Sequence, residues 1–188
     1  MIISCGDLPL YYLNFLIDAF NVPCFYVPGN HDKQFESEQP QGWVSLDQKI
    51  VTHQGITLAG LGGSPFYNGE SPFQYTESEM YWRCFKLKAK LLWQKKVDIF
   101  VSHSPAVGLG DIKNSRIHKG FKSIKNFLQH QQPKLFVYGH VHLTYGTQRM
   151  GIFDETLFVN SYGKYHLNFF KLAEVKKNVP KMNIHFSN

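Results

Sequence analysis

The sequence predicts an α/β protein in which two β-sheets pack against each other and helices cover the outside. Over the first part of the chain, short apolar runs typical of buried strands alternate with amphipathic stretches of helical period. After these come only strand-like stretches, near 145–150, 156–160, 166–175 and 182–186. An α/β half followed by mainly antiparallel strands predicts two packed sheets with external helices.

The N-terminal part predicts a strand, a helix and a second strand. Residues 2–5 form a short apolar run that is typical of a buried strand. A helix is expected over 9–20, with Leu13, Leu16, Ile17 and Phe20 on one face. Residues 22–27 predict another buried strand, which ends at Pro28-Gly29.

The middle of the chain contains a strong helix signal. The run Thr76-Glu77-Ser78-Glu79 is a capping box, in which Thr76 is the N-cap and the Glu79 side chain reaches back. It opens a helix to about residue 96, and the expected apolar stripe contains Tyr81, Phe85, the Lys88 stem, Leu92 and Trp93. The remaining elements are a hairpin at 49–53 and 56–60, buried strands at 97–102 and 135–138, and a helix at 120–131.

Composition predicts a soluble globular chain with one domain over residues 1–188. The apolar share of 43% and the charged share of 18% are those of such proteins. A formal net charge of +6 suits an anionic substrate, a phosphate backbone or solubility, so nucleic acid stays an open partner. We find no signal peptide and no apolar run of membrane-spanning length, and therefore expect a cytoplasmic protein without a membrane partner.

Three cysteines, Cys5, Cys24 and Cys84, form no CxxC pair and no even framework. We expect reduced thiols in the core of a protein from a reducing compartment.

Polar residues able to bind metal ions follow four of the predicted buried strands. They are Gly6-Asp7, Gly29-Asn30-His31-Asp32, His103 and Gly139-His140-Val141-His142. Ligand sites in open α/β sheets lie at the carboxyl ends of the strands, so these residues are expected to converge. Carboxylate, amide and imidazole groups suit Mn²⁺, Fe, Zn²⁺, Co²⁺ or Mg²⁺, and such a mixed set also fits a two-metal site.

Within this set, Asp7 is the natural carboxylate to bridge two ions. His140 and His142 are two residues apart, so in extended backbone they point to the same side and can serve different ions. His31 is expected at the rim as a general acid, with Asp32 orienting its ring. The alternative for this pair is a surface turn with a spectator histidine.

In their order along the chain, these motifs resemble the calcineurin-like metallophosphoesterases, whose usual pattern is D-x-H, GD, GNH(D/E), H and GHxH. The match runs from residue 6 to residue 142, and GNHD together with GHVH is specific at this spacing. The stretches 60–64, 74–80 and 118–121 look like a subgroup of small bacterial and archaeal phosphoesterases. The resemblance implies a four-layer α/β/β/α sandwich of two mixed sheets.

The resemblance also implies a role for each site residue. Asp7 would bridge both ions, Asn30, His103 and His140 would complete one of them, and His142 would bind the other. His31 would sit beside the phosphate, stabilise the transition state and protonate the leaving group.

The chain departs from the family pattern at its start, because no D-x-H precedes Asp7 and the first central strand is missing. Truncation at a misplaced start is favoured over a naturally reduced family member. One ion then keeps four protein ligands and the other two, so we expect one firm metal site and a second that is weak or empty. Weak candidates for replacement ligands are His53, Asp111 and His118.

A missing central strand also leaves strand edges to be paired. The expected ways to fill the gap are the strand at 182–186, a strand from a second chain in a swapped dimer, or closure of the sheet.

The expected activity is hydrolysis of a phosphomonoester or a phosphodiester by attack of a metal-bound hydroxide, with manganese among the candidate metals. A catalytically weak or inactive domain that binds metal or a partner is the alternative, because the D-x-H ligands are absent. A nuclease is a further alternative, favoured by the basic charge. The loop 62–75, with Phe66, Tyr67, Phe73 and Tyr75, is a candidate lining of the substrate pocket.

Overall fold

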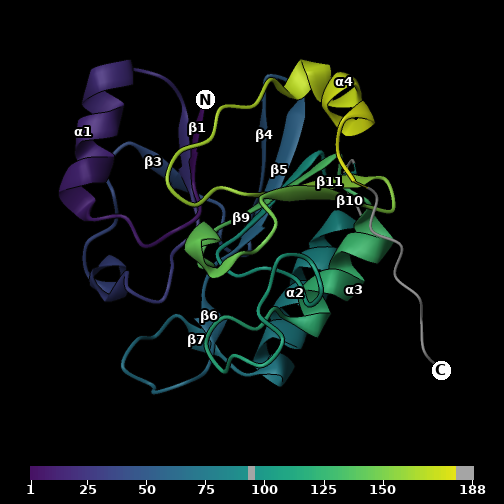
Figure 1. The fold of residues 1–188 in the computed structure, drawn as a ribbon. Helices are drawn as coiled ribbons and strands as arrows, with labels where there is room; N and C mark the ends of the chain where they lie inside the picture. Colours follow the sequence, from purple (N-terminus) through teal and green to yellow (C-terminus); the bar gives the residue numbers. More distant parts are fainter. Residues whose placement is uncertain (93–95, 181–188) are drawn as a thin grey trace.

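The computed structural model describes residues 1–92 and 96–180 of the chain, and its elements form four layers (Figure 1). Helices α2 (Glu77–Leu91) and α3 (Lys122–Gln131) form one outer layer, and helix α1 (Leu10–Phe20) forms the other. A six-stranded sheet and a three-stranded sheet lie between them. The α/β fold with two packed sheets is confirmed.

The six-stranded sheet is mixed, with antiparallel strands at its two edges. Its order is β10 (Met150–Phe153), β11 (Thr156–Asn160), β9 (Leu135–Tyr138), β8 (Ile99–Ser102), β5 (Ile56–Leu61) and β4 (Ile50–His53). The four inner strands run parallel, and β10 and β4 are antiparallel to their neighbours. Because β8 and β9 are neighbours, the residues that follow them emerge side by side.

The three-stranded sheet consists of β1 (Ile2–Ser4), β2 (Cys24–Tyr26) and β3 (Trp43–Ser45), in that order. Both of its pairings are parallel, so the expectation of two mixed sheets is wrong for this smaller one. The strands follow one another through α1 and through a connection containing the short 3₁₀ helix η1 (Lys33–Glu36), and such crossovers leave neighbouring strands parallel.

Three hydrophobic clusters hold the four layers together. Phe100 and Phe136 pack against Met80 and Phe127 between the six-stranded sheet and α2 and α3. A second cluster joins the two sheets, and a third packs Leu13 of α1 onto the three-stranded sheet. All three cysteines are buried free thiols within these clusters, as the sequence predicted.

Helix α2 buries a different face from the predicted one. The buried residues are Met80, Cys84, Leu87 and Leu91, which repeat at helical spacing. Tyr81, Phe85 and Leu92 are exposed, and Trp93 lies outside the described residues. The capping box is present as predicted, with Thr76 and Glu79 bonding each other's backbone. The sequence supplied two apolar stripes of the same period, and the tertiary structure covered the one without aromatic rings.

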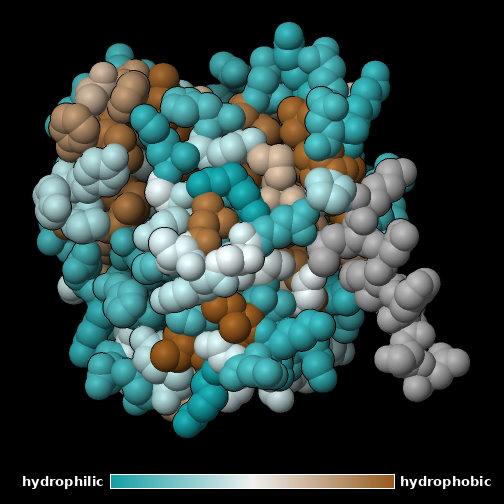
Figure 2. All heavy atoms as spheres, viewed as in Figure 1, coloured by the Kyte–Doolittle hydropathy of each residue, from teal (hydrophilic) through white to brown (hydrophobic). Residues whose placement is uncertain are grey.

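Helix α1 is apolar on its outer side as well as its inner side. Leu13 is buried, whereas Tyr11, Phe15 and Phe20 are exposed, so the expected placement of Phe20 on the buried face is wrong. Apolar side chains accordingly gather over this helix in Figure 2. In the described part of the chain, no helix combines the length and apolarity needed to span a membrane.

The prediction of a strand at 166–175 is wrong. This stretch forms a 3₁₀ turn, η3 (Phe169–Lys171), and helix α4 (Leu172–Lys177). Leu167, Phe169, Leu172, Val175 and Val179 pack into the cluster between the sheets, so the segment covers part of the six-stranded sheet's inner face. Leu172, Val175 and Val179 have helical spacing. Other apolar residues in the same stretch made this spacing hard to distinguish from that of a strand.

Two further boundaries differ or cannot be compared. The stretch 145–150 is mostly loop after a 3₁₀ turn, η2 (Leu143–Tyr145), and β10 begins only at Met150. The strand expected at 182–186 lies outside the described residues.

Candidate metal centre

The metal-competent residues gather where strands of both sheets end. Asp7 follows β1, Asn30 follows β2, His103 follows β8 and His140 follows β9. Ligand-binding atoms of Asp7, His103 and His140 all lie within 4.8 Å of one another. The predicted convergence of the four strand ends is therefore present in the fold.

The spacing of the four acceptor atoms fits a single ion. His103 Nε2 lies 3.0 Å from Asn30 Oδ1, 3.1 Å from His140 Nδ1 and 3.4 Å from Asp7 Oδ2. Ligands bound at about 2.0–2.2 Å to one divalent ion, with tetrahedral or octahedral angles between them, lie about 3.0–3.5 Å apart. The three separations from His103 Nε2 fall in that range.

Backbone carbonyls fix the protonation of both imidazoles. His103 Nδ1 lies 2.6 Å from the carbonyl oxygen of Cys5, and His140 Nε2 lies 2.9 Å from that of Ile117. A carbonyl only accepts, so each of these nitrogens carries a proton, and in the neutral imidazole the other nitrogen has the lone pair. Both lone pairs face the centre. Such outer partners are typical of metal-binding histidines.

Electrostatics favour the neutral form of His140. Its burial, and then the neighbouring His103 imidazole, lower the pKa of His140 to about 3. A neutral imidazole binds a metal, whereas an imidazolium does not. The centre therefore presents a carboxylate, an amide oxygen and two imidazole nitrogens, which are all groups able to bind a divalent ion.

Asp7 and His140 both have left-handed backbone conformations, with φ of 60° and 64°. Residues other than glycine pay for this conformation, which persists where the surroundings enforce it, and functional sites are common places. Gly6 next to Asp7 is required by close approach, because a Cβ there would lie 2.4 Å from the nitrogen of Gly29. The loop that follows β1 and the loop that follows β2 are thus packed backbone against backbone.

Asp32 makes its hydrogen bonds to backbone groups, whereas the sequence predicted a contact with the His31 ring. Its Oδ2 accepts the backbone N–H groups of Asp7 at 2.8 Å and Gly29 at 2.7 Å, and the residue is 2% exposed. Burial raises the pKa of Asp32 to about 6, and the two N–H groups act in the opposite direction. Among the described residues, Asp32 makes no hydrogen bond to the His31 ring. It ties two site loops together instead.

His31 is exposed beside the centre. Its backbone N–H donates to Asp7 Oδ1 at 2.8 Å, which fixes the main chain at this point and holds the carboxylate. One oxygen of Asp7 thus faces His31 while the other faces His103.

His142 is separate from the acceptor cluster. Its ring stacks on Tyr162, with centroids 4.3 Å apart, and on Tyr145 at 5.5 Å. Sequence reasoning did not identify Tyr162, which follows β11 and carries no motif that would reveal it. His118, one of the weak candidates, lies with its ring 5.2 Å from that of His140 and 5.0 Å from that of Tyr145.

The other two weak candidates lie elsewhere. Asp111 accepts the N–H groups of Gly108 and Gly120 and so closes its own loop. His53 is on edge strand β4, with its ring against Phe25.

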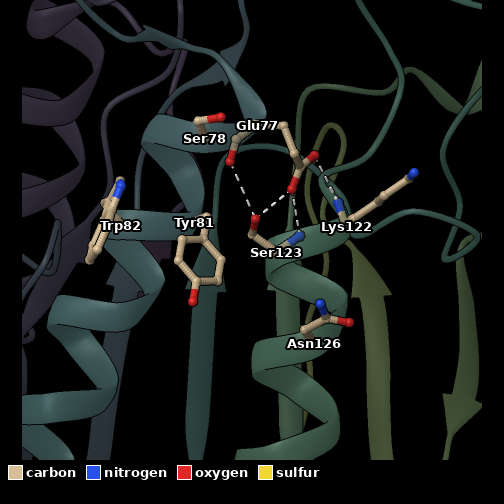
Figure 3. A pocket seen from close by; sticks show the side chains of 7 residues that line it. All are labelled: Glu77, Ser78, Tyr81, Trp82, Lys122, Ser123 and Asn126. Carbon is tan, nitrogen blue, oxygen red and sulfur yellow. Dashed lines mark hydrogen bonds between the residues drawn. The ribbon is translucent and has the colours of Figure 1, made fainter.

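A hollow of about 350 Å³ between α2 and α3 contains none of the residues of the metal centre (Figure 3). It is lined by Glu77, Ser78, Tyr81, Trp82, Lys122, Ser123 and Asn126. The Glu77 carboxylate accepts the N–H groups of Lys122 at 3.1 Å and Ser123 at 2.7 Å, as the dashed lines show. Glu77 of one helix thereby caps the N-terminus of the other, so this polar floor has a structural explanation.

Comparison with known proteins agrees with this geometry. Residues 2–143 match the family model of the calcineurin-like phosphoesterases. This match covers most of the chain, and the protein belongs to that family. Its members are metal-dependent phosphoesterases, which is consistent with the carboxylate, amide and imidazole donors at the strand ends.

The individual proteins to which this chain is similar share less than a third of its residues. An uncharacterized protein of Methanocaldococcus jannaschii is 28% identical over 193 residues, which cover 95% of this chain and 83% of the relative. A crystal structure of TT1561 from Thermus thermophilus has a TM-score of 0.54 and 18% identity, covering 81% of this chain and 68% of that one. Another crystal structure has a TM-score of 0.56 and 18% identity. The chain spans 65% of its length, slightly under two thirds. At this identity the two structures show the shared fold.

Proposed function

We propose that this chain hydrolyses phosphate esters, either monoesters or diesters, with a divalent metal ion held by Asp7, Asn30, His103 and His140. The observation that carries the proposal is the convergence of a carboxylate oxygen, an amide oxygen and two imidazole nitrogens, with the other nitrogen of each ring against a backbone carbonyl. Such a set repels itself and is stabilised by a cation. A divalent ion there supplies Lewis acidity toward a phosphoryl oxygen and makes water a better nucleophile at neutral pH.

The protein residues around the centre have distinct parts in this proposal. The Asp7 carboxylate accepts the His31 backbone N–H through one oxygen, which orients the other oxygen toward His103. His31 is the general acid that protonates the leaving-group oxygen, because it is the exposed imidazole attached directly to a metal ligand's loop. Asp32 maintains the spacing between the loops that carry Asp7 and Asn30.

We further propose one firm metal site and a second, weak one, with manganese as the metal to test first. His142 supports this assignment, because its ring stacks on Tyr162 and Tyr145 and is not part of the cluster. Metal analysis after dialysis should find one equivalent of Mn²⁺ per chain. Two retained equivalents would contradict the assignment.

The test of function compares p-nitrophenyl phosphate and bis-p-nitrophenyl phosphate with metal-stripped protein before and after addition of Mn²⁺. We expect turnover of at least one substrate that returns only with the metal. His103→Ala should abolish both turnover and metal retention. His166→Ala is the matched control, because His166 is an exposed histidine outside the centre, and it should leave both unchanged.

An inactive metal-binding domain is the competing proposal, and the position of His142 is the observation that favours it. In that case the chain retains Mn²⁺ but hydrolyses neither substrate with any divalent metal. Salt-sensitive cleavage of DNA in the same assay series would instead identify a nuclease, to which the net charge of +6 is suited.

A further inference from the structure

We infer that Tyr67 is a positioning residue for the metal ligand Asn30: its hydroxyl oxygen holds the amide so that the carbonyl oxygen faces the centre. This inference rests on the proposed function only in requiring that the centre binds a divalent ion. It concerns a side chain from the loop 66–73, which lies between β6 (Ser64–Pro65) and β7 (Gln74–Tyr75) and supplies none of the four ligands.

Asn30 needs an external constraint to act as a ligand. Its side-chain amide has an acceptor at one end and a donor at the other, and only the oxygen binds a metal ion. The residue is 3% exposed, so water is a poor partner for the NH₂ group. Rotating the amide by half a turn would direct that group at the metal position and remove one ligand.

Tyr67 supplies the constraint. Asn30 Nδ2 donates to the Tyr67 hydroxyl oxygen at 3.1 Å, while Asn30 Oδ1 lies 3.0 Å from His103 Nε2. The two contacts lie on opposite sides of the same amide. Outer partners of this kind orient metal ligands, and losing one typically weakens metal binding by about 10–100-fold.

Gln74 fixes the backbone that carries Tyr67. Its side-chain oxygen accepts the N–H groups of Tyr67 at 3.1 Å and of Asn68 and Gly69 at 3.2 Å. Its Nε2 donates to Asn68 Oδ1 at 2.7 Å, and the residue is only 7% exposed. One buried side chain therefore satisfies three successive backbone donors, which gives the loop a defined shape.

The same loop is docked onto the segment that carries Asn30. The N–H of Gly63, just before β6, donates to the carbonyl of Pro28 at 2.8 Å. A Cβ on Gly62 would lie 2.6 Å from Pro28, so the two stretches are in close contact. The loop 66–73 and the segment that carries Asn30 are thus joined at Pro28 and again at Asn30. These contacts fix the position of the Tyr67 hydroxyl relative to the Asn30 amide.

The test measures Mn²⁺ affinity by titration calorimetry, which does not depend on catalysis. Tyr67→Phe removes the acceptor oxygen and should raise the Kd for Mn²⁺ by about 10–100-fold. The thermal midpoint of the metal-free protein should fall by only a few degrees, because the ring remains in place and the buried Asn30 NH₂ group loses one acceptor, at a cost of about 1–3 kcal/mol. Tyr81→Phe is the matched control, since Tyr81 is an exposed tyrosine on α2 and lines the separate hollow of Figure 3.

A double substitution shows whether Tyr67 acts through Asn30. In an Asn30→Ala background there is no amide to orient, so adding Tyr67→Phe should not weaken Mn²⁺ binding further. The inference is overturned if Tyr67→Phe leaves the Kd unchanged, or if its effect is the same with and without the Asn30 amide. Hydrolysis is assayed separately: a chain that binds Mn²⁺ with the expected Tyr67 effect but never turns over substrate refutes the proposed function and supports this inference.

Discussion

Replacement of Asp32 by alanine should destabilise the protein through two backbone groups rather than through His31. In the variant, the N–H groups of Asp7 and Gly29 lose their shared acceptor. A donor left unsatisfied in a buried position costs about 1–3 kcal/mol, so the two together cost about 2–6 kcal/mol. The lower half of this range is appropriate because Asp7 is only partly buried. For a chain of this size, a loss of about 3 kcal/mol lowers the thermal midpoint by about 6–12 °C.

The isosteric Asp32→Asn variant is the control, because the amide keeps an acceptor oxygen where the carboxylate oxygen was. It loses the charge of the acceptor, and also the cost of burying that charge, which is what raises the pKa of Asp32 to about 6. We therefore expect a midpoint much closer to that of the unchanged protein. Thermal unfolding of metal-free samples followed by circular dichroism measures both. Equal midpoints for the alanine and asparagine variants would refute the reasoning.

Three further predictions concern His31, Glu77 and Glu79. His31→Ala should reduce turnover by about 10²–10⁴-fold while Mn²⁺ stays bound, and unchanged turnover would exclude a general-acid role. Glu77→Ala removes the cap of α3 and should cost about 1–2 kcal/mol in urea unfolding, with Glu70→Ala as an exposed control of unchanged stability. The backbone N–H and the hydroxyl of Thr76 lower the pKa of Glu79, so its stabilisation is present above its unfolded pKa near 4.3 and is lost as the pH falls through the folded value. Acid unfolding of Glu79→Gln should therefore show a weaker pH dependence, and an identical profile would contradict the capping box's role.

The exposed aromatic rings show where sequence patterns were ambiguous. In α2, the stripes through Met80 and through Tyr81 have the same period, and periodicity alone does not rank them. The packing of α2 on α3 and on the six-stranded sheet chose the stripe of smaller side chains. The prediction of a strand at 166–175 was wrong for a related reason. The apolar residues of this stretch fit a strand and a helical turn equally well until the face that they cover is known.

The assignment of site residues divides in the same way. The sequence predicted that Asp7, Asn30, His103 and His140 lie close together, because each follows a buried apolar run whose carboxyl end is a predictable location. The sequence did not predict the groups that hydrogen-bond to these residues. The carbonyls of Cys5 and Ile117, which face the two imidazoles, are backbone groups, and the side chains of these residues do not indicate such a role.

What the sequence by itself determined is the order of elements, the capping box and the metal-competent residues at four strand ends, since these depend on local periodicity and on residue chemistry. Only the tertiary structure decided that Asp32 ties two loops together, that His142 stacks on two tyrosines, and that the hydroxyl of Tyr67 meets the amide of Asn30. These contacts join residues from separate loops. Their geometry depends on how the layers pack, which no short stretch of sequence encodes.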